Sequence, residues 1–254
     1  MRLLTALALA SRAACSTPSP PAGPAPAPPQ AALPEPPSAA NAADRHREVH
    51  WFRTAAEYRA LALQVYRSAG RMVEGIGDGR VPGTWAVIMD ADETVLDNSE
   101  FERRIAESGE PFEEEMWSEW VLEEAAGAIP GARDFIERVQ TAGGRVAIVT
   151  NRDEVLCPAT RRNLAALGIQ PAVVLCERET GEKEPRFRQV QDGTAADGLP
   201  PLAVVAWIGD NIGDFPDLDQ DAREGPEEAY RLFGSRYFVL PNPMYGSWMG
   251  NEWR

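Results

Sequence analysis

The sequence predicts an α/β fold, with a parallel sheet flanked by helices, a small helical cap and an N-terminal helix. The main observation is that short apolar runs alternate with stretches of helical periodicity, which is typical of parallel sheets covered by helices on both faces. The second observation is size, because about 210 residues follow an N-terminal stretch that cannot form a core. That length suits one domain with a small insertion.

Residues 1–15 have the features of an export signal. One arginine precedes the apolar run LLTALALA, and small residues come before Cys15. The run is too short to span a bilayer. Cys15 follows two alanines as in a bacterial lipoprotein cleavage site, although Arg12 stands where an aliphatic residue is expected. We therefore predict export to the periplasm or the outer membrane, with a lipid on Cys15 as the membrane anchor.

Residues 16–45 are predicted to be a linker. Ten of the 22 prolines lie within residues 16–40, mixed with alanine and serine. This composition cannot build a core and favours extended polyproline II, a semi-rigid spacer. We interpret the segment as a tether that holds a domain off a membrane, and a leader without a task is the alternative. The folded domain is expected over residues 46–254.

The folded part begins with a predicted amphipathic helix over residues 54–72, with Thr54 as its expected N-cap. The apolar runs that predict strands are residues 85–89, 146–149, 172–175, 202–208 and 237–240. Helices are expected between them near residues 130–142, 155–167, 183–191 and 222–232. Ligands of such sheets bind beyond the carboxyl ends of the strands, so the residues after each run are the candidates for chemistry.

The longer stretch 98–128, between the first two strands, is predicted to form the cap. It is rich in glutamate and aromatic residues, has a helical pattern and is too long for a simple crossover. Trp117 and Trp120 lie three residues apart in it. The plain interpretation is that they line the buried face of the cap helix, and we prefer this for Trp120.

Charge and motif content exclude several classes of function. The formal net charge is −14 and no cluster of basic residues offsets it, which excludes a nucleic-acid polymer as partner. The two histidines, His46 and His50, precede the main elements and lack the RHG context of a histidine acid phosphatase. No GxSxG motif supports serine hydrolase chemistry. A small anion neutralised by a metal remains an acceptable ligand.

Two pairs of carboxylates follow predicted strands. Asp90 and Asp92 come directly after the first run, and Asp210 and Asp214 follow the fourth. Carboxylates this close together at a strand end are costly unless a cation compensates them, and a hard divalent ion with oxygen ligands would do so. A solvated acidic turn is the alternative, and the apolar residues on either side of Asp90 and Asp92 argue against it.

Groups that could bind an anion lie between the two acidic pairs. Thr150 and Asn151 follow the second run, where a hydroxyl and backbone N–H groups leading into a helix can hold phosphoryl oxygens. The chain has 25 basic residues, and only Lys183 is a lysine. It stands at the predicted start of a helix. The sequence therefore orders the motifs as acid pair, threonine, lysine, acid pair.

This ordered set resembles the four motifs of the phosphatases of the haloacid dehalogenase (HAD) superfamily. More narrowly, DADETVLDN, WSEW, VTNR, KEPRF, GDNIGDF and LPNPMYGSW resemble the class C bacterial acid phosphatases, lipoprotein enzymes that include 5′-nucleotidases. The resemblance extends from about Trp51 to Trp248. It implies a HAD-like Rossmannoid sheet and an acid phosphatase that hydrolyses phosphomonoesters.

The resemblance also implies a role for each motif residue. Asp90 would be the nucleophile that forms an aspartyl-phosphate, and Asp92 would be the general acid and base. Thr150, Asn151 and Lys183 would bind the phosphoryl oxygens. These types suit phosphoryl transfer, in which positioning and charge neutralisation supply most of the catalysis.

The metal implied by the resemblance is Mg²⁺. Its ligands would be Asp90, the backbone carbonyl of Asp92, and Asp210, and Asp214 would support the metal site. Arg186 is expected at the surface or behind the ligands, rather than among them.

The resemblance further implies a nucleoside 5′-monophosphate as substrate, with its base held by Trp117 and Tyr245. Phe101 stands near a position where relatives often carry a tyrosine. Two alternatives stay open, namely another small ester such as a sugar phosphate, and a surface lipoprotein that uses a phosphatase scaffold for binding. A homodimer is expected from the resemblance alone.

Cys157 and Cys176 remain if Cys15 is lipidated or removed. An oxidising compartment would permit a disulfide between them. Two buried free thiols are the alternative, and the sequence does not separate these possibilities.

Overall fold

The computed structural model describes residues 46–252 of the chain. The predicted signal peptide with Cys15 and the whole predicted linker, residues 16–45, lie outside the described residues, so the predicted domain boundaries stay predictions. None of the helices in the described part is both long and apolar enough to cross a membrane.

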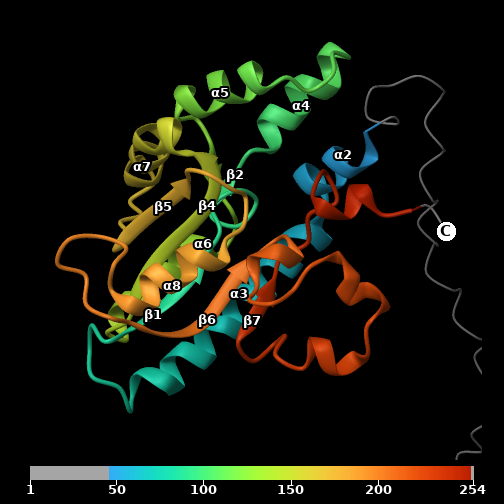
Figure 1. Ribbon diagram of the computed structural model, residues 1–254. Helices are drawn as coiled ribbons and strands as arrows, with labels where there is room; N and C mark the ends of the chain where they lie inside the picture. The colour runs from blue at the N-terminus through green and yellow to red at the C-terminus, as the bar shows by residue number, and fades with distance from the viewer. Residues whose placement is uncertain (1–45, 253–254) are drawn as a thin grey trace, which may run out of the picture. The chain divides into compact units, whose positions relative to one another are not determined.

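A parallel sheet forms the centre of the domain (Figure 1). Its strands are β1 (Trp85–Met89), β4 (Arg145–Asp153), β5 (Val173–Glu177), β6 (Ala203–Gly209) and β7 (Tyr237–Val239). They lie in the order β5-β4-β1-β6-β7, and every neighbouring pair is parallel. All the predicted strands are present, and the predicted fold class is confirmed. Because the chain builds outward from β1 to β5 and then returns to β6 on the other side of β1, the sheet has its topological switch point at β1.

The helices of the described part are α2 (Arg47–Thr54), α3 (Ala56–Gly77), α4 (Ser99–Ser108), α5 (Glu114–Glu123), α6 (Ala132–Thr141), α7 (Cys157–Ala166) and α8 (Glu184–Asp192). Helices α6, α7 and α8 match the helices predicted after the first strand. The predicted helix at 222–232 is wrong in type, because two short 3₁₀ helices, η3 (Gln220–Glu224) and η4 (Glu227–Tyr230), occupy it. Gly225 and Pro226 separate them, and proline cannot continue a helix because it lacks the N–H donor.

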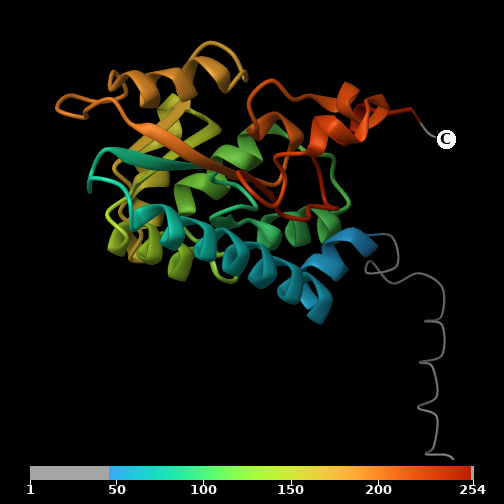
Figure 2. The same ribbon diagram turned by 90° about the horizontal axis from the view of Figure 1, so that it is seen from below.

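The sheet is covered on both faces. Trp85, Val87 and Met89 belong to the core beneath α3, α6 and α7, whereas Ala86 and Ile88 belong to a second core beneath α8. Figure 2 shows α3 and α8 on opposite sides of the strands. Burial on both faces explains why β1 appears in the sequence as an unbroken apolar run.

The N-terminal helix differs from the prediction at its start. Thr54 ends α2 and is not the cap of α3, whose N-cap is Ala55 and carries no side-chain hydrogen bond. The Thr54 hydroxyl instead donates to the His50 carbonyl at 2.7 Å. Helix α2 exists because Val49 and Phe52 are buried against the core, a tertiary contact that the periodicity of residues 54–72 does not reveal.

The predicted cap is present as α4 and α5. The chain enters and leaves it through β2 (Leu96–Asp97) and β3 (Gly127–Ala128), which pair antiparallel at its base. Gly109, with φ +71°, ends α4 in the left-handed conformation that glycine adopts without strain. Figure 1 shows α5 at the end of the sheet toward which the arrows of β4 and β5 point.

Candidate active site

Three residues of the predicted motifs meet at the carboxyl ends of the central strands. Asp90 follows β1, Asp210 follows β6, and Thr150 lies in the last part of β4. The Asp90 amide donates to the Ile208 carbonyl at 2.9 Å, so the ladder between β1 and β6 continues as far as the aspartate. Since β1 lies between β4 and β6, these residues become neighbours at the switch point of the sheet.

Lys183, directly before α8, brings the only lysine of the chain to the same point. Its Nζ donates to Asp90 Oδ1 and to Asp214 Oδ1, the latter at 2.6 Å. Burial acts to lower the pKa of Lys183, but Asp214 and Asp90 outweigh it and hold the pKa above its ordinary value. The buried ammonium therefore stays charged and joins two carboxylates from different motifs.

Asp214 is fixed by a turn that its own neighbours form. Its Oδ2 accepts from the Asn211 amide at 2.8 Å, while the Asn211 side chain accepts from the Gly213 amide at 3.1 Å. This is a reciprocal cap of the short helix η2 (Ile212–Asp214). A Cβ at Gly209 would come within 2.2 Å of Asp214 Oδ2, so only glycine fits before Asp210.

Asp210 is held from two sides. The Thr94 hydroxyl donates to its Oδ1 at 3.2 Å, and Asn242 Nδ2 donates to its Oδ2 at 2.9 Å. Thr94 is fixed in turn, because its carbonyl accepts from the buried Tyr66 hydroxyl. Asn242 lies in the segment after β7, so the C-terminal part of the chain supports the acidic cluster directly.

The acidic cluster of Asp90, Asp210 and Asp214 suits a hard divalent cation. Oxygens of the three carboxylates lie within 4.8 Å of one another. They face one ammonium, so two negative charges are uncompensated when all four groups are ionised. Burial raises the pKa of Asp90 to about 7 despite the opposing effect of Lys183, and burial with Asp214 and Asp90 raises the pKa of Asp210 well above its ordinary value. A divalent cation with oxygen ligands would remove this penalty.

The carboxylate of Asp92 lies outside the acidic cluster. Its Oδ1 accepts from Arg152 Nη2 at 2.7 Å and from Asn98 Nδ2 at 2.7 Å. The charge of Asp92 is therefore compensated by Arg152 and does not require a metal. This geometry is compatible with a metal contact through the backbone carbonyl of Asp92, as the resemblance implies.

Arg186 joins the two segments that carry the predicted phosphate-binding residues. Its Nη1 donates to the Thr150 carbonyl, and its Nη2 donates to Asn151 Oδ1 at 2.6 Å and to the carbonyls of Gly181 and Glu182 at 3.3 and 3.2 Å. Burial lowers the pKa of Arg186. Arg186 was expected either at the surface or behind the ligands, and the structure places it behind the ligands. Arg186 therefore holds the Asn151 side chain through its oxygen.

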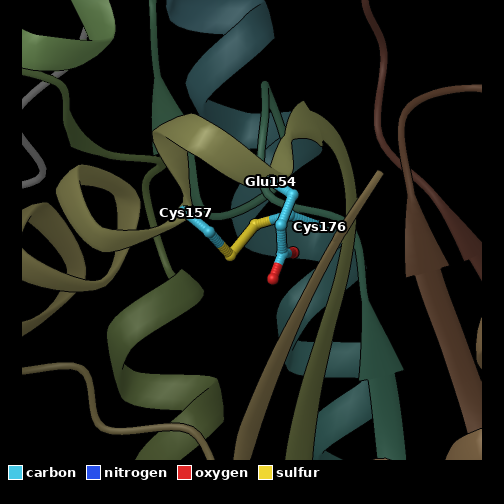
Figure 3. Close-up of side chains that lie close together, drawn as sticks. All are labelled: Glu154, Cys157 and Cys176. Atoms are coloured by element: carbon cyan, nitrogen blue, oxygen red, sulfur yellow. A yellow bond between two sulfur atoms is a disulfide. The ribbon is translucent and has the colours of Figure 1, made fainter. Parts of the chain in front are cut away.

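A disulfide joins Cys157 to Cys176 and reinforces the same region (Figure 3). It links the start of α7, just after β4, to β5, which leads into the segment before Lys183. Of the two alternatives left by the sequence, the disulfide is therefore the one observed. The Glu154 carboxylate lies beside the sulfur atoms. Glu154, Cys157 and Cys176 do not form a metal site, because both cysteines are oxidised in the disulfide and offer no thiolate.

The aromatic residues predicted to hold a base lie on two different segments. Trp117, on α5, is half-buried, and its ring meets Phe101 edge-on at 5.3 Å and lies over the Arg152 guanidinium at 5.4 Å. Tyr245 is half-buried against the main core. No ring contact joins Trp117 to Tyr245 within residues 46–252. Trp120 is buried, as preferred from the sequence, and Phe101 is buried beside it.

Sequence reasoning missed four residues that hold the site together: Asn98, Arg152, Arg186 as a bridge, and Asn242. Each lies inside a motif whose other residues carried the prediction. Arg152 follows Thr150 by two positions, and Asn98 ends DADETVLDN. In the sequence, each of these residues is a polar residue near an apolar run. Ordinary surface turns show the same pattern, so it did not single them out. Only the tertiary structure shows how far they are removed from solvent.

The arrangement can bring an anionic substrate to a buried carboxylate. Lys183 and a cation in the acidic cluster would neutralise the substrate, Asp90 could act as nucleophile, and Asp92 lies two residues away as a second carboxylate. The family model of the HAD superfamily, subfamily IIIB (acid phosphatase), matches residues 36–248. The match includes every predicted site residue.

Solved structures agree with this match. The class C acid phosphatase from Bacillus anthracis is 28% identical to this chain, with a TM-score of 0.73 over 82% of this chain and 88% of that one. The same enzyme with tungstate bound is 27% identical, with a TM-score of 0.72 and the same coverage of each chain.

Proposed function

The chain belongs to subfamily IIIB of the HAD superfamily, the acid phosphatases, and from this premise we propose that it hydrolyses nucleoside 5′-monophosphates with Mg²⁺ through an aspartyl-phosphate on Asp90. Phosphomonoester hydrolysis follows from the family. The observation that carries the finer proposal is the cluster of Asp90, Asp210 and Asp214, in which the buried Lys183 pairs with Asp90 and Asp214. Such a cluster suits a nucleophile that must meet an anionic phosphate beside a divalent cation.

In the first chemical step an Asp90 carboxylate oxygen attacks phosphorus, and the bond from phosphorus to the ester oxygen breaks. Asp92 gives its proton to the departing oxygen. In the second step water attacks the aspartyl-phosphate, Asp92 accepts a proton from that water, and the bond to Asp90 breaks. The covalent intermediate divides one difficult displacement into two easier ones.

The phosphoryl oxygens would be bound by the Thr150 hydroxyl, backbone amides near Asn151, and Lys183. Arg186 supports this assignment because it ties the Thr150 and Asn151 segment to the segment before Lys183. Tungstate, which is bound in the second Bacillus anthracis structure, is a tetrahedral oxyanion like phosphate. We expect it to compete with substrate here.

Mg²⁺ would be held by Asp90, Asp210 and the Asp92 carbonyl, with Asp214 in support. When bound, it supplies positive charge that offsets the phosphoryl oxygens. The fit rests on the two uncompensated charges of the acidic cluster. Thr94 and Asn242 hold both oxygens of Asp210 in place, so this ligand is oriented by the protein itself.

The nucleotide preference rests on Trp117 and Tyr245. Both residues are partly exposed, Trp117 on α5 and Tyr245 in the C-terminal segment, and a base could stack on either ring. A sugar phosphate would use the same charged residues without this stacking. A comparison of turnover on the two kinds of ester therefore distinguishes the two proposals.

The test is phosphate release from AMP, nicotinamide mononucleotide, glucose 6-phosphate and p-nitrophenyl phosphate, each with Mg²⁺ and with EDTA. We expect turnover only with metal, fastest on the nucleotides, and its loss in Asp90→Asn but not in the exposed Asp134→Asn. Faster turnover of glucose 6-phosphate would keep Asp90 as nucleophile and remove the roles of Trp117 and Tyr245. A folded, metal-binding protein without turnover on any ester would favour the binding lipoprotein instead.

We also propose that the protein is exported and anchored through a lipid on Cys15. The Cys157–Cys176 disulfide supports export, because disulfides persist in oxidising compartments. Labelling with a radioactive fatty acid should mark the wild type and not Cys15→Ser. The homodimer rests on the family resemblance, and light scattering of the purified protein decides it.

A further inference from the structure

Arg152 is an arginine whose side chain is almost wholly inaccessible, with 1% of it exposed. It lies in β4, two residues after Thr150. A buried guanidinium is costly unless its N–H groups all find acceptors and its charge is paired. The groups that meet these requirements are therefore to be sought among the protein neighbours of Arg152.

The hydrogen bonds of Arg152 converge on Asp92. Its Nε and Nη2 donate to Asp92 Oδ1 at 2.9 and 2.7 Å. Its Nη2 also donates to Asn98 Oδ1 at 3.1 Å, and its Nη1 donates to Thr160 Oγ1 at 3.3 Å. The hydrogen bonds to Asn98 and Thr160 therefore fix the guanidinium while it holds the Asp92 carboxylate.

Asn98 holds the same oxygen from another direction. This fully buried residue donates from Nδ2 to Asp92 Oδ1 at 2.7 Å. Its own Oδ1 accepts from Trp120 Nε1 at 2.8 Å, and its backbone amide donates to Glu93 Oε1 at 2.7 Å. The amide orientation of Asn98 is therefore fixed by a donor on one side and an acceptor on the other.

The two oxygens of Asp92 are consequently unequal. Oδ1 accepts three hydrogen bonds, two from Arg152 and one from Asn98. Among residues 46–252, Oδ2 accepts only one longer hydrogen bond, at 3.2 Å, from Arg152 Nε. Of the Asp92 side chain 18% is exposed, whereas both residues that hold it are buried. One oxygen is anchored, and the other keeps lone pairs available for a proton.

The cap contacts both residues that hold Asp92. The Trp117 ring lies 5.4 Å from the Arg152 guanidinium, and Trp120 donates to Asn98. Both tryptophans lie on α5. A continuous set of contacts therefore runs from the cap helix, through Arg152 and Asn98, to the carboxylate next to the nucleophile.

We propose that Arg152 and Asn98 are positioning residues that anchor Asp92 through Oδ1, so that Oδ2 is the oxygen that transfers protons, and that Trp117 and Trp120 set this geometry from the cap. The proposal rests on the proposed function, since it needs Asp92 as general acid and base. As the bond from phosphorus to the ester oxygen breaks, the proton on Oδ2 moves to that oxygen. In the second step Oδ2 accepts a proton from the attacking water while the bond from phosphorus to the Asp90 oxygen breaks.

Leaving-group dependence tests the proposal. A poor leaving group, such as the alkoxide of an alkyl phosphate, needs the proton, whereas 2,4-dinitrophenolate departs without it. In Arg152→Met we expect kcat/KM to fall by about 10²-fold or more on an alkyl phosphate, within the range of general acid catalysis, and by less than about threefold on 2,4-dinitrophenyl phosphate. Trp120→Phe keeps an aromatic ring and removes the N–H donor, so it should show the same selectivity to a smaller extent and is the safer variant for folding.

Arg162→Met is the matched control. Arg162 also reaches the cap, through an exposed ion pair with Glu124, but it does not contact Asp92. It should leave both kcat/KM values unchanged. A loss of equal size on all esters in Arg152→Met and Trp120→Phe would overturn the positioning role, because a purely structural defect does not distinguish leaving groups.

The variant Asp92→Asn distinguishes a failure of the positioning role from a failure of the proposed function on which it rests. If Asp92→Asn is selective for poor leaving groups and Arg152→Met is not, the proposed function stands and the positioning role is overturned. If Asp92→Asn itself affects all esters equally, Asp92 is not the general acid. In that case the positioning role of Arg152 and the proposed role of Asp92 are both overturned. If both single variants are selective, Arg152→Met should add no further selectivity to Asp92→Asn, since the two act through one group.

Discussion

The two sides of the site are built from different interactions. The floor, which consists of Asp90, Lys183, Asp210 and Asp214, is charged, largely buried and tied together by hydrogen bonds. The cap side, which consists of α4, α5 and the C-terminal segment with Tyr245, offers aromatic rings and exposed ion pairs such as Arg104–Glu123. Loss of Lys183 on the floor leaves two buried carboxylates without their cation, whereas loss of the Tyr245 ring on the cap side removes only its own contacts. Phosphoryl transfer should therefore depend most strongly on the floor, whereas the cap side should set substrate choice and, through Trp117 and Trp120, the position of Asp92.

The largest effect expected is that of Lys183→Met. It leaves Asp90 and Asp214 buried without their cation, and breaking a buried pair in this way costs about 3–5 kcal/mol. Activity should fall by about 10²- to 10³-fold, the size of effect seen when one charge-stabilising donor is lost. Urea unfolding and phosphate release measure the two effects.

Arg188→Met is the control for Lys183→Met, because Arg188 lies on the same helix with an exposed ion pair to Glu184. Exposed pairs contribute little, so its unfolding midpoint and its activity should match the wild type. If Lys183→Met behaved like Arg188→Met, the contrast between the floor and the exposed charges would fail.

Removal of the disulfide should have the next largest effect on stability. Cys157 and Cys176 are 19 residues apart, and closing a loop of that size stabilises a fold by about 3 kcal/mol. The double variant Cys157→Ala/Cys176→Ala should lose that much unfolding free energy. Its activity at 25 °C should persist, because Arg186 independently ties the Thr150 segment to Gly181 and Glu182, next to Lys183. A loss of activity in the folded variant would instead assign the disulfide a part in placing the phosphate-binding segments.

Magnesium should stabilise the floor more strongly as pH rises. Burial raises the pKa of Asp90 to about 7. A carboxyl with a raised folded pKa stabilises the fold fully below its unfolded pKa of about 4, and this contribution is lost as pH rises through about 7. The metal-free protein should therefore lose stability between about pH 4 and 7.

Mg²⁺ competes with the proton on Asp90, so the Tm gained by adding it should be larger at pH 8 than at pH 5. At a hundredfold excess over Kd the gain is about 2.7 kcal/mol. Thermal unfolding with Mg²⁺ and with EDTA measures the difference, and Asp90→Asn should lose most of it. An equal gain at both pH values would show that this carboxylate does not bind the metal.

Part of the floor could be predicted from sequence because Asp90 and Asp210 follow strands directly. Once the apolar runs gave a parallel sheet, Asp90, Thr150 and Asp210 had to lie at one edge, and their types pointed to a metal and a phosphate. The missed partners have no such signal. Asn98 and Arg152 are recognised only because the fold buries them against Asp92, and their sequence neighbours give no indication of that contact.

The cap side was less predictable for a different reason. Helical periodicity indicates which residues share a face, but it does not say whether the face meets the core or a ligand. Trp120 is buried and Trp117, three residues earlier, is only half-buried. The helix predicted at 222–232 failed because Gly225 and Pro226 interrupt a favourable pattern. Tyr245, in a segment without helix or strand, could be assigned only by resemblance.

The smallest effect belongs to Tyr245 and tests the cap side alone. Stacking on a base contributes roughly 1–3 kcal/mol, so Tyr245→Ala should raise KM for a nucleoside 5′-monophosphate by about 5- to 150-fold. KM for glycerol 3-phosphate, which has no base, should stay unchanged. Tyr245→Phe should match the wild type, because the hydroxyl is buried without a hydrogen-bond partner among the described residues and the ring is retained. If Tyr245→Ala instead lowered kcat equally on both esters, the C-terminal segment would act on the floor, through Asn242 and Asp210, and the division between the two sides would have to be redrawn.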